Sequence, residues 1–277
     1  MKENTIRKSV VFGGTGLHSA ARVNLTLKPS ESGGIVFRIN DNEIAAKYDN
    51  VVDTQLGTTI GNGTQKILTI EHLMAALWAC SIDNVVVEMD NQEVPILDGS
   101  SKLFIEEIRK AGIRELKTDK RYLKIRKEVV VEDKNKYIKA SPNDKFSVKC
   151  AVEFDYGNIG IQKFLFNGKK DNFKKGIARA RTFCNEKEIE YMRSVGLARG
   201  GSLDNAMVFN DVGLINGGGF RVEKEVVKHK ILDCVGDMYT SGYNIIGKII
   251  SHKGGHTLNN MLLKKIFTDE SLYEVIA

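Results

Sequence analysis

The order of secondary-structure signals repeats along the chain, and this repeat constrains the fold more than any other feature. In the first half, strand-like runs such as 22–27 and 34–39 precede a helical segment from Thr69 to about Ala79. Strand 84–89 and a helix from Ser100 or Ser101 to Ala111 follow. The first helix carries an apolar stripe at helical spacing, formed by Ile70, Leu73, Met74 and Leu77.

The second half repeats this order. Strand-like runs lie at 122–126, 128–132, 137–140 and 146–152, and after them come helix 223–239, strand 244–250 and helix 257–267. In each half a histidine near the start of a helix, His72 or His229, is followed after about a dozen residues by an apolar strand and another helix. Two such layers packed together would bring both histidines to one interface.

Between the halves, residues 114–121 are mostly charged and have neither a helical nor a strand period, which favours a linker. At roughly 100–200 residues per domain, 277 residues accommodate two domains, and we expect them at 1–117 and 118–277. The second half also contains a segment without a partner in the first, with a helix over 186–194. We expect this insertion to add a binding surface.

The composition is that of a folded globular protein, with 42% hydrophobic and 27% charged residues, so disordered and fibrous classes are excluded. No apolar run approaches the ~20 residues of a transmembrane helix, and charges near the N-terminus argue against a signal peptide, so a cytoplasmic protein is expected. The four cysteines lack CxxC spacing and are expected to be free thiols. The net charge of +6 favours an anionic partner without identifying it.

The segment 227–237 contains the most informative motif. Val227, Ile231, Cys234 and Met238 form one stripe of the helix, whereas His229, Asp233 and Asp237 follow one another at i, i+4 and i+8 on nearly the opposite face. A histidine and an aspartate one turn apart can bind one Zn²⁺ ion. A solvated histidine–aspartate pair on the helix surface is the simpler alternative.

A catalytic zinc site needs a third protein ligand, and His72 is the candidate. Glu71 beside it is the right type of residue to take a proton from water, although a glutamate is also ordinary in the first turn of a helix. His256 could protonate a leaving amine, with Asp237 orienting it and raising its pKa, or it could simply begin a helix. Three of the 5 histidines thus fall at positions that the repeat would bring together.

Other motifs are weaker. The glycine-rich segment 13–18 lacks the spacing of a phosphate-binding loop and is expected to form a tight turn. The lysine pairs 169–170 and 174–175 lack interleaved aromatic residues, so no nucleic-acid partner is expected. A phosphate- or nucleic-acid-binding module with structural histidines remains the alternative from another functional class, and it predicts no bound metal and strongly salt-dependent binding.

An ordered set of motifs covering nearly the whole chain resembles the UDP-3-O-acyl-N-acetylglucosamine deacetylase family, the zinc amidases of lipid A biosynthesis. The motifs lie at 11–18, 69–72, 82–85, 95–100, 180–183, 200–202, 229–233 and 254–259. The resemblance implies an α+β fold of two similar domains, each a β-sheet with a helical layer. They would be packed helices to helices as a β-α-α-β sandwich, with one insert per domain. It also implies a cytoplasmic protein, expected to be a monomer, that meets an acylated UDP-sugar with a lipid tail at the inner membrane surface.

The resemblance further implies a role for individual residues. His72, His229 and Asp233 would bind Zn²⁺, or Fe²⁺, which the same ligand set accepts. Glu71 would be the general base and His256, oriented by Asp237, the general acid in hydrolysis of an N-acetyl group that releases acetate. The remaining implied residues are Lys230 near the diphosphate and reaction centre, Thr182 at the oxyanion, Phe183 on the sugar nucleotide, and, along an acyl-chain passage in an insert at about 183–209, Ile189, Ala198, Ser202, Leu203, Ala206 and Val208.

Several positions depart from the family pattern. Ala20 replaces a usual glycine, Lys228 a usual arginine and Arg199 an expected apolar residue, and the run 217–219 is unusually glycine-rich. None of these residues is an implied ligand or the base, so activity is expected. The chain stops at Ala277, so the dehydratase domain of the fused bifunctional version is not expected. An amidase of the same scaffold acting on a different acylated sugar is a further alternative.

Overall fold

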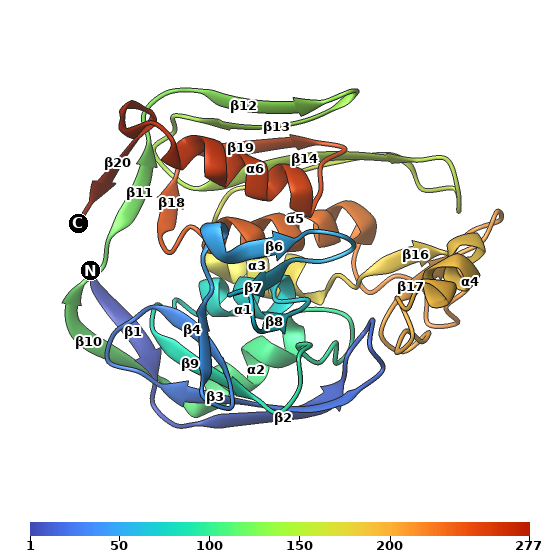
Figure 1. Cartoon of the computed structure of the whole chain (residues 1–277). Helices are drawn as coiled ribbons and strands as arrows, with labels where there is room; N and C mark the ends of the chain where they lie inside the picture. Colours follow the sequence, from blue (N-terminus) through green and yellow to red (C-terminus); the bar gives the residue numbers. More distant parts are fainter.

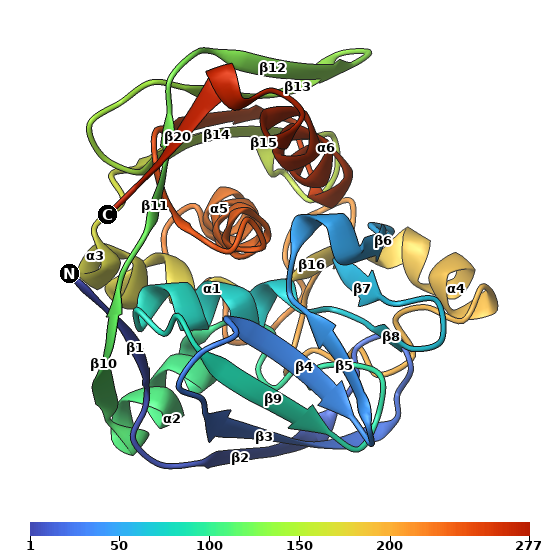
Figure 2. The ribbon, with the colours of Figure 1, turned by 60° about the vertical axis from the view of Figure 1, so that its left-hand side comes forward.

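The computed structural model describes all 277 residues and contains two five-stranded sheets with helices between them (Figures 1 and 2). Helices α1 (Glu71–Ala79) and α2 (Lys102–Ala111) belong to the first half. The strands of the first sheet are, in spatial order, β2 (Val10–Thr15), β3 (Arg22–Pro29), β9 (Val85–Met89), β4 (Ile35–Ile39) and β5 (Asn42–Ala45).

The second half is built in the same way, with helices α5 (Glu225–Tyr239) and α6 (His256–Phe267) on the inner side of its sheet (Figure 2). Its strands are, in spatial order, β12 (Val129–Asp133), β13 (Lys136–Ser141), β19 (Lys248–His252), β14 (Ser147–Phe154) and β15 (Gly160–Phe166).

The two sheets share strand order and strand direction. In the first, the central strand β9 pairs antiparallel with β3 and parallel with β4. In the second, the central strand β19 pairs antiparallel with β13 and parallel with β14. The predicted duplication and the β-α-α-β sandwich are therefore confirmed. The domain boundary between residues 117 and 118 stays a prediction, because one buried apolar cluster runs through both halves.

Each half carries an insert at the same point of the repeat, between its last edge strand and its first inner helix. The first insert is a small sheet of β6 (Val51–Asp53), β7 (Thr59–Gly61) and β8 (Lys66–Ile67). The second is longer, and its outer part projects from the body (Figure 1). It contains α3 (Lys170–Lys175), β16 (Phe183–Asn185), α4 (Glu186–Ser194) and β17 (Met207–Phe209). Short 3₁₀ turns lie at Tyr48–Asn50, Ile177–Arg179 and Glu270–Leu272.

Helix α1 differs from its predicted amphipathic pattern, because all nine of its residues are buried. It lies between its own sheet and α5, so no face reaches solvent (Figure 2). The two helices approach closely at Gly236, where an added Cβ would lie 2.1 Å from the backbone oxygen of Glu71. The polar face of α5 consequently points to the other half of the molecule and not to water.

The predicted linker is wrong in its local structure. Residues Ile113–Asp119 form strand β10, which pairs antiparallel with β1 (Lys2–Ile6). Only Leu116 of β10 is buried, because the two strands form a ribbon at the surface. The apolar alternation of a half-buried strand is therefore missing, and the sequence is typical of a loop.

The single strand predicted at 244–250 is also wrong. The chain breaks at Gly247 into β18 (Asn244–Ile246) and β19, which belong to different sheets. A Cβ at Gly247 would lie 2.7 Å from Cγ1 of Ile125, so a glycine allows the strands to cross closely here. Strand β18 pairs with β11 (Tyr122–Ile125), which also pairs with β20 (Tyr273–Ile276).

The structure also bears on the expectations about the cysteines and about membrane-spanning helices. All four cysteines are unpaired, and all but Cys184 are buried. No helix has both the length and the apolar character that a membrane crossing requires.

Candidate metal centre and apolar pocket

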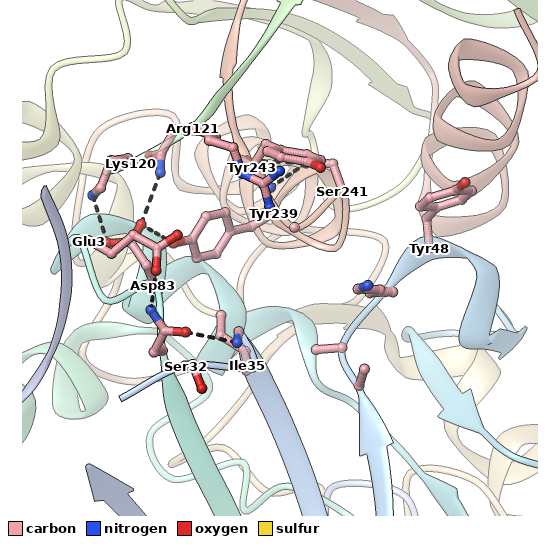
Figure 3. Close-up of a pocket in the computed structure, with 18 of the residues that line it drawn as sticks. Glu3, Ser32, Ile35, Tyr48, Asp83, Lys120, Arg121, Tyr239, Ser241 and Tyr243 are labelled. Carbon is pink, nitrogen blue, oxygen red and sulfur yellow. Dashed lines mark hydrogen bonds and ion pairs between the residues drawn. The ribbon is translucent and has the colours of Figure 1, made fainter. Parts of the chain in front are cut away.

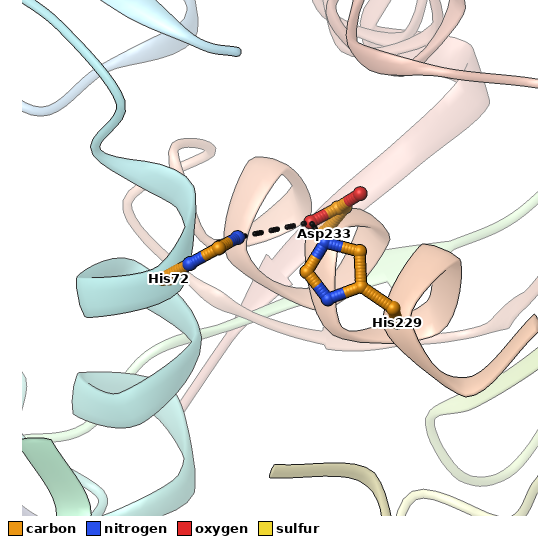
Figure 4. Close-up of side chains that lie close together, drawn as sticks. All are labelled: His72, His229 and Asp233. Atoms are coloured by element: carbon orange, nitrogen blue, oxygen red, sulfur yellow. Dashed lines mark ion pairs between the residues drawn. The ribbon is translucent and has the colours of Figure 1, made fainter. Parts of the chain in front are cut away.

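Three predicted ligands meet where α1 and α5 cross (Figure 4). Nε2 of His72 lies 3.6 Å from Oδ1 of Asp233, and Nε2 of His229 lies 3.3 Å from the same oxygen. The two imidazole rings are nearly perpendicular, with centroids 5.0 Å apart. The predicted meeting of the two histidines is confirmed, and the ligand atoms lie within 4.8 Å of one another.

The chemistry of these atoms fits a divalent cation. All three side chains are buried, and Oδ1 of Asp233 has no hydrogen-bond donor in the protein. Nδ1 of His229 lies 3.1 Å from the carbonyl oxygen of Ala180, to which it donates, so Nε2 presents its lone pair to the centre. Two imidazole nitrogens and one carboxylate oxygen are ligands that Zn²⁺ and Fe²⁺ both accept.

The protonation states support this interpretation. Burial lowers the pKa of His229 to about 3, so its imidazole is neutral at physiological pH. Burial by itself raises the pKa of Asp233, but neighbouring His229 and Lys230 outweigh it and hold this pKa well below its usual value. A neutral imidazole beside an ionised carboxylate is the state in which both groups bind a metal ion.

Glu71 lies beside the ligand cluster at the first position of α1, and its side chain is buried. Its Oε2 accepts a hydrogen bond of 2.9 Å from the backbone N–H of Thr58. Gly57 packs closely against this carboxylate, since an added Cβ at Gly57 would lie 3.1 Å from Oε1 of Glu71. Burial raises the pKa of Glu71, which suits a carboxylate that must accept a proton during a reaction.

His256 begins α6 and forms the predicted pair with Asp237. Its Nδ1 donates to Oδ2 of Asp237 over 2.8 Å, and its Nε2 faces the ligand cluster, 4.0 Å from Oδ2 of Asp233. Burial by itself lowers the pKa of His256, but the Asp237 carboxylate outweighs it and raises this pKa to about 9. The imidazole therefore carries a proton at neutral pH.

Lys230 contacts the cluster, and the segment of Thr182 is held near the start of α5. Nζ of Lys230 lies 2.6 Å from Oδ2 of Asp233. Thr182 belongs to an extended segment that the buried ion pair of Arg181 with Glu225, 2.9 Å long, fastens to the first turn of α5. The backbone N–H of Thr182 also donates to the carbonyl oxygen of Gly99, so the segment is fixed to both halves.

An apolar pocket of about 260 Å³ opens beside Thr182. The second insert supplies most of its lining, and Leu17 and Leu56 come from the first half. All the residues that the resemblance implies for substrate binding lie in its wall: Phe183, Ile189, Ala198, Ser202, Leu203, Ala206 and Val208. The pocket thus gathers a set that is spread over 26 positions of sequence, from 183 to 208.

The departures from the family pattern lie away from the ligands. Ala20 has a φ of 59°, in the region that favours glycine. Arg199 is exposed and does not line the pocket. The Lys228 ammonium lies 5.0 Å from the centre of the Phe164 ring, and glycines 217–219 have no neighbour within 4 Å of an added Cβ.

Sequence reasoning missed several residues of this region. His18, in the segment expected to be a plain turn, is buried against the pocket, and its Nδ1 accepts from the N–H of Ala198. Thr58 contacts both Glu71 and Asp237, and Asn259 donates to Asp237 over 2.7 Å. Asn259 lies in a motif that the resemblance marks, whereas no pattern in the sequence singles out Thr58.

A second, larger pocket of about 570 Å³ lies at the other end of the inner helices (Figure 3). It is bordered by Tyr239 at the end of α5, some ~15 Å along the helix from His229. Its buried charges satisfy each other, as Lys120 lies 2.8 Å from Asp83. None of its lining residues belongs to the group that could hold a metal ion, which lies at the crossing of α1 and α5.

Hydrolysis requires one group to take a proton from water and another to return a proton to the leaving group, and the cluster has Glu71 next to His72 in the chain and His256 near Asp233. The fold and this site therefore define the class of hydrolytic enzymes. Comparison of the sequence with protein families gives a match over residues 3–268 to UDP-3-O-acyl N-acetylglycosamine deacetylase. The chain belongs to this family of amidohydrolases.

Individual relatives agree over the full length. The UDP-3-O-acyl-N-acetylglucosamine deacetylase of Nautilia profundicola is 45% identical over 100% of this chain and 95% of its own. The enzyme of that name from Helicobacter pylori is 40% identical with the same coverage. That from Myxococcus xanthus is 43% identical over 99% of this chain and 89% of its own.

Proposed function

We propose that this enzyme is a zinc-dependent deacetylase that hydrolyses the N-acetyl group of UDP-3-O-acyl-N-acetylglucosamine and releases acetate in lipid A biosynthesis. The observation that carries the proposal is the convergence of His72, His229 and Asp233 beside Glu71 in a member of this family. The names of the relatives supply the substrate. The donor set also accepts Fe²⁺ as an alternative ion.

The reaction assigns a separate task to each polar side chain. His72, His229 and Asp233 would hold the ion, which when bound polarises a carbonyl group and makes water more acidic. Glu71 accepts the proton of the attacking water. The Thr182 hydroxyl donates a hydrogen bond to the amide oxygen as negative charge develops there. Nε2 of His256, which the raised pKa of this histidine keeps protonated at neutral pH, then gives its proton to the departing amine.

The apolar pocket fits the acyl chain of the substrate. Each buried methylene is worth ~0.8 kcal/mol, so a long chain contributes much of the binding free energy. Phe183, at the inner end of the insert, would pack on the sugar nucleotide, and Lys230 would attract the diphosphate. We infer a cytoplasmic enzyme acting as a monomer, with transient contact to the inner membrane surface where such a lipid-tailed substrate resides.

Elemental analysis of the purified protein together with two variants tests the metal centre. We expect about one divalent ion per chain, and its loss in His72→Ala. Glu71→Gln should keep the ion and lose about 10²–10⁴-fold in turnover, because only the proton acceptor is removed. His252→Ala is the matched control, since His252 stacks on Tyr137 away from the site. Full activity of Glu71→Gln would refute the assigned base.

A larger side chain in the pocket wall, which narrows the pocket, tests the acyl-chain site. Ala206 is buried in this wall, and Ala206→Phe should fill part of the 260 Å³ volume. We expect KM to rise for substrates with long acyl chains and to change little for short ones. Asp204→Asn, at an exposed neighbouring position, is the control. A second assay uses substrates in which the nucleotide or the acyl group is replaced. Unchanged activity would mean that the enzyme does not recognise the replaced group and acts on a different acylated sugar.

A further inference from the structure

We propose that Thr58 is a positioning residue that couples the general base to the general acid, so that the insert of the first half completes the reaction centre. The inference rests on the proposed function, because it assigns Thr58 a part in that reaction. Thr58 lies in the loop between β6 and β7, far in sequence from α5 and α6, and is 2% exposed.

The main chain of Thr58 fixes the base. Its N–H donates to Oε2 of Glu71 over 2.9 Å, and its carbonyl oxygen accepts from the N–H of Ile70 over 3.2 Å. The N–H and carbonyl groups of Thr58 thus hold both the carboxylate of Glu71 and the backbone of the preceding residue, Ile70. The side chain of Thr58 is left free to reach the other half of the molecule.

The side chain of Thr58 fixes the acid through Asp237. Its Oγ1 donates to Oδ1 of Asp237 over 2.6 Å, and no other group donates to this oxygen. A hydroxyl has a single proton, so towards Nδ1 of His256, 3.3 Å away, Oγ1 can only accept. Nδ1 must therefore carry the hydrogen, which it also shares with Oδ2 of Asp237. Nε2 is left to face the reaction centre.

The loop is fastened to α6 by a second contact. Oγ1 of Thr54 lies 2.8 Å from Oγ1 of Thr257, the residue after His256. Figure 2 shows the β6–β7 segment next to α6 and α5. Without the Thr58 hydroxyl, Asp237 would keep its donors on Oδ2, from His256 and Asn259, and lose the one that holds Oδ1. The carboxylate could then rotate and carry the imidazole with it.

Thr58→Val tests the proposal, because it keeps the shape and the backbone N–H and removes only the hydroxyl. We expect kcat to fall about 10–100-fold with KM changed far less and with the ion content unchanged. Thr58→Ser should restore most of the loss. Thr59→Val is the matched control, since Thr59 is the adjacent buried threonine and its side chain makes no hydrogen bond. A wild-type kcat in Thr58→Val, or no rescue by serine, would overturn the proposal.

A double-mutant cycle with Asp237→Asn separates positioning from general damage. If Thr58 acts through Asp237, adding Thr58→Val to Asp237→Asn should lower kcat little further. Fully multiplicative losses would contradict the coupling.

NMR of the metal-free protein gives a readout without turnover. We expect the Nδ1 proton of His256 to be sharp in the wild type and in Thr58→Ser and broadened in Thr58→Val. Equal signals in all three would refute the inference. If the wild type did not deacetylate the substrate, the proposed function would fail, whereas this measurement would still decide whether Thr58 positions His256.

Discussion

At the scale of single residues, hydrogen bonds decide which nitrogen of each catalytic histidine is available. The N–H at Nδ1 of His229 donates a hydrogen bond to the Ala180 carbonyl, and the N–H at Nδ1 of His256 donates one to Asp237. Both rings therefore direct Nε2 towards Asp233, one ring neutral and the other protonated. Two identical side chains acquire different functions through their partners.

Asp237→Asn should lower the pKa of His256 in the metal-free protein from about 9 to below its usual 6.5. The substitution removes the negative charge that stabilises the imidazolium, while the burial that disfavours it remains. His256 would then be neutral at pH 7 in the metal-free protein, whereas in the wild type its charge is lost only as pH rises through about 9.

NMR titration of His256 in the wild type and in Asp237→Asn measures this change. An unaltered pKa of His256 would show that Asp237 does not set its charge.

The clustering of the candidate ligand residues was predictable because local spacing carries their signal. His229 and Asp233 lie one helical turn apart, and Glu71-His72 stands at a helix start. Thr58 was not predictable, because its role arises from contacts with residues 13 and 179 positions away. Contacts between residues so far apart in the chain produce no regular spacing of residue types in the sequence.

At the scale of elements, the crossing of α1 and α5 sets the distances within the metal centre. His72 is on one helix and His229 and Asp233 are on the other, so a shift of either helix changes the distances from His72 to the other two side chains. Gly236 lies in α5 between the ligand Asp233 and Asp237, at the closest approach to the backbone of Glu71.

Gly236→Ala should destabilise the protein by about 1–3 kcal/mol, because the methyl group overlaps the backbone of α1. Helix propensity alone predicts a gain of up to about 1 kcal/mol, so the sign of the change distinguishes the two effects. The displaced helix should also weaken metal binding. Urea unfolding and metal titration measure both quantities.

Gly217→Ala is the control for this prediction, since an added Cβ there meets nothing within 4 Å and should change stability by less than about 0.5 kcal/mol. A stabilised Gly236→Ala protein with normal metal affinity would mean that α1 can move without consequence.

At the scale of the whole molecule, the reaction centre and the larger pocket lie at opposite ends of the inner helices. The ion pair of Lys120 with Asp83 lies in the wall of the larger pocket (Figure 3) and joins the strands that link the two halves to the loop after α1. Oδ2 of Asp83 also accepts from the N–H of Asn4. Both charged side chains are nearly buried.

Lys120→Met should lower the free energy of unfolding by about 3–5 kcal/mol, because it leaves the Asp83 carboxylate buried without its cation. Metal content and kcat should stay unchanged, since the pair is remote from the ligands. Urea denaturation checks the first expectation and elemental analysis with an activity assay the second.

The control is Lys2→Met, which breaks the nearby but exposed pair with Asp119 and should alter stability by less than about 1 kcal/mol. Similar small losses in both variants would show that the Lys120 pair does not hold the halves together.

The sequence by itself predicted the repeated α+β order and the two histidines and the aspartate that meet between the inner helices, because periodicity, helix-start chemistry and one-turn spacing are properties of neighbouring residues. Tertiary structure alone decided that 113–119 pairs as a strand, that 244–250 splits between two sheets, and that Thr58 joins Glu71 to Asp237. Each of these depends on partners distant in the chain. The surface ribbon, the close crossing at Gly247 and the contacts of Thr58 with two carboxylates all depend on packing, which neighbouring residues do not encode.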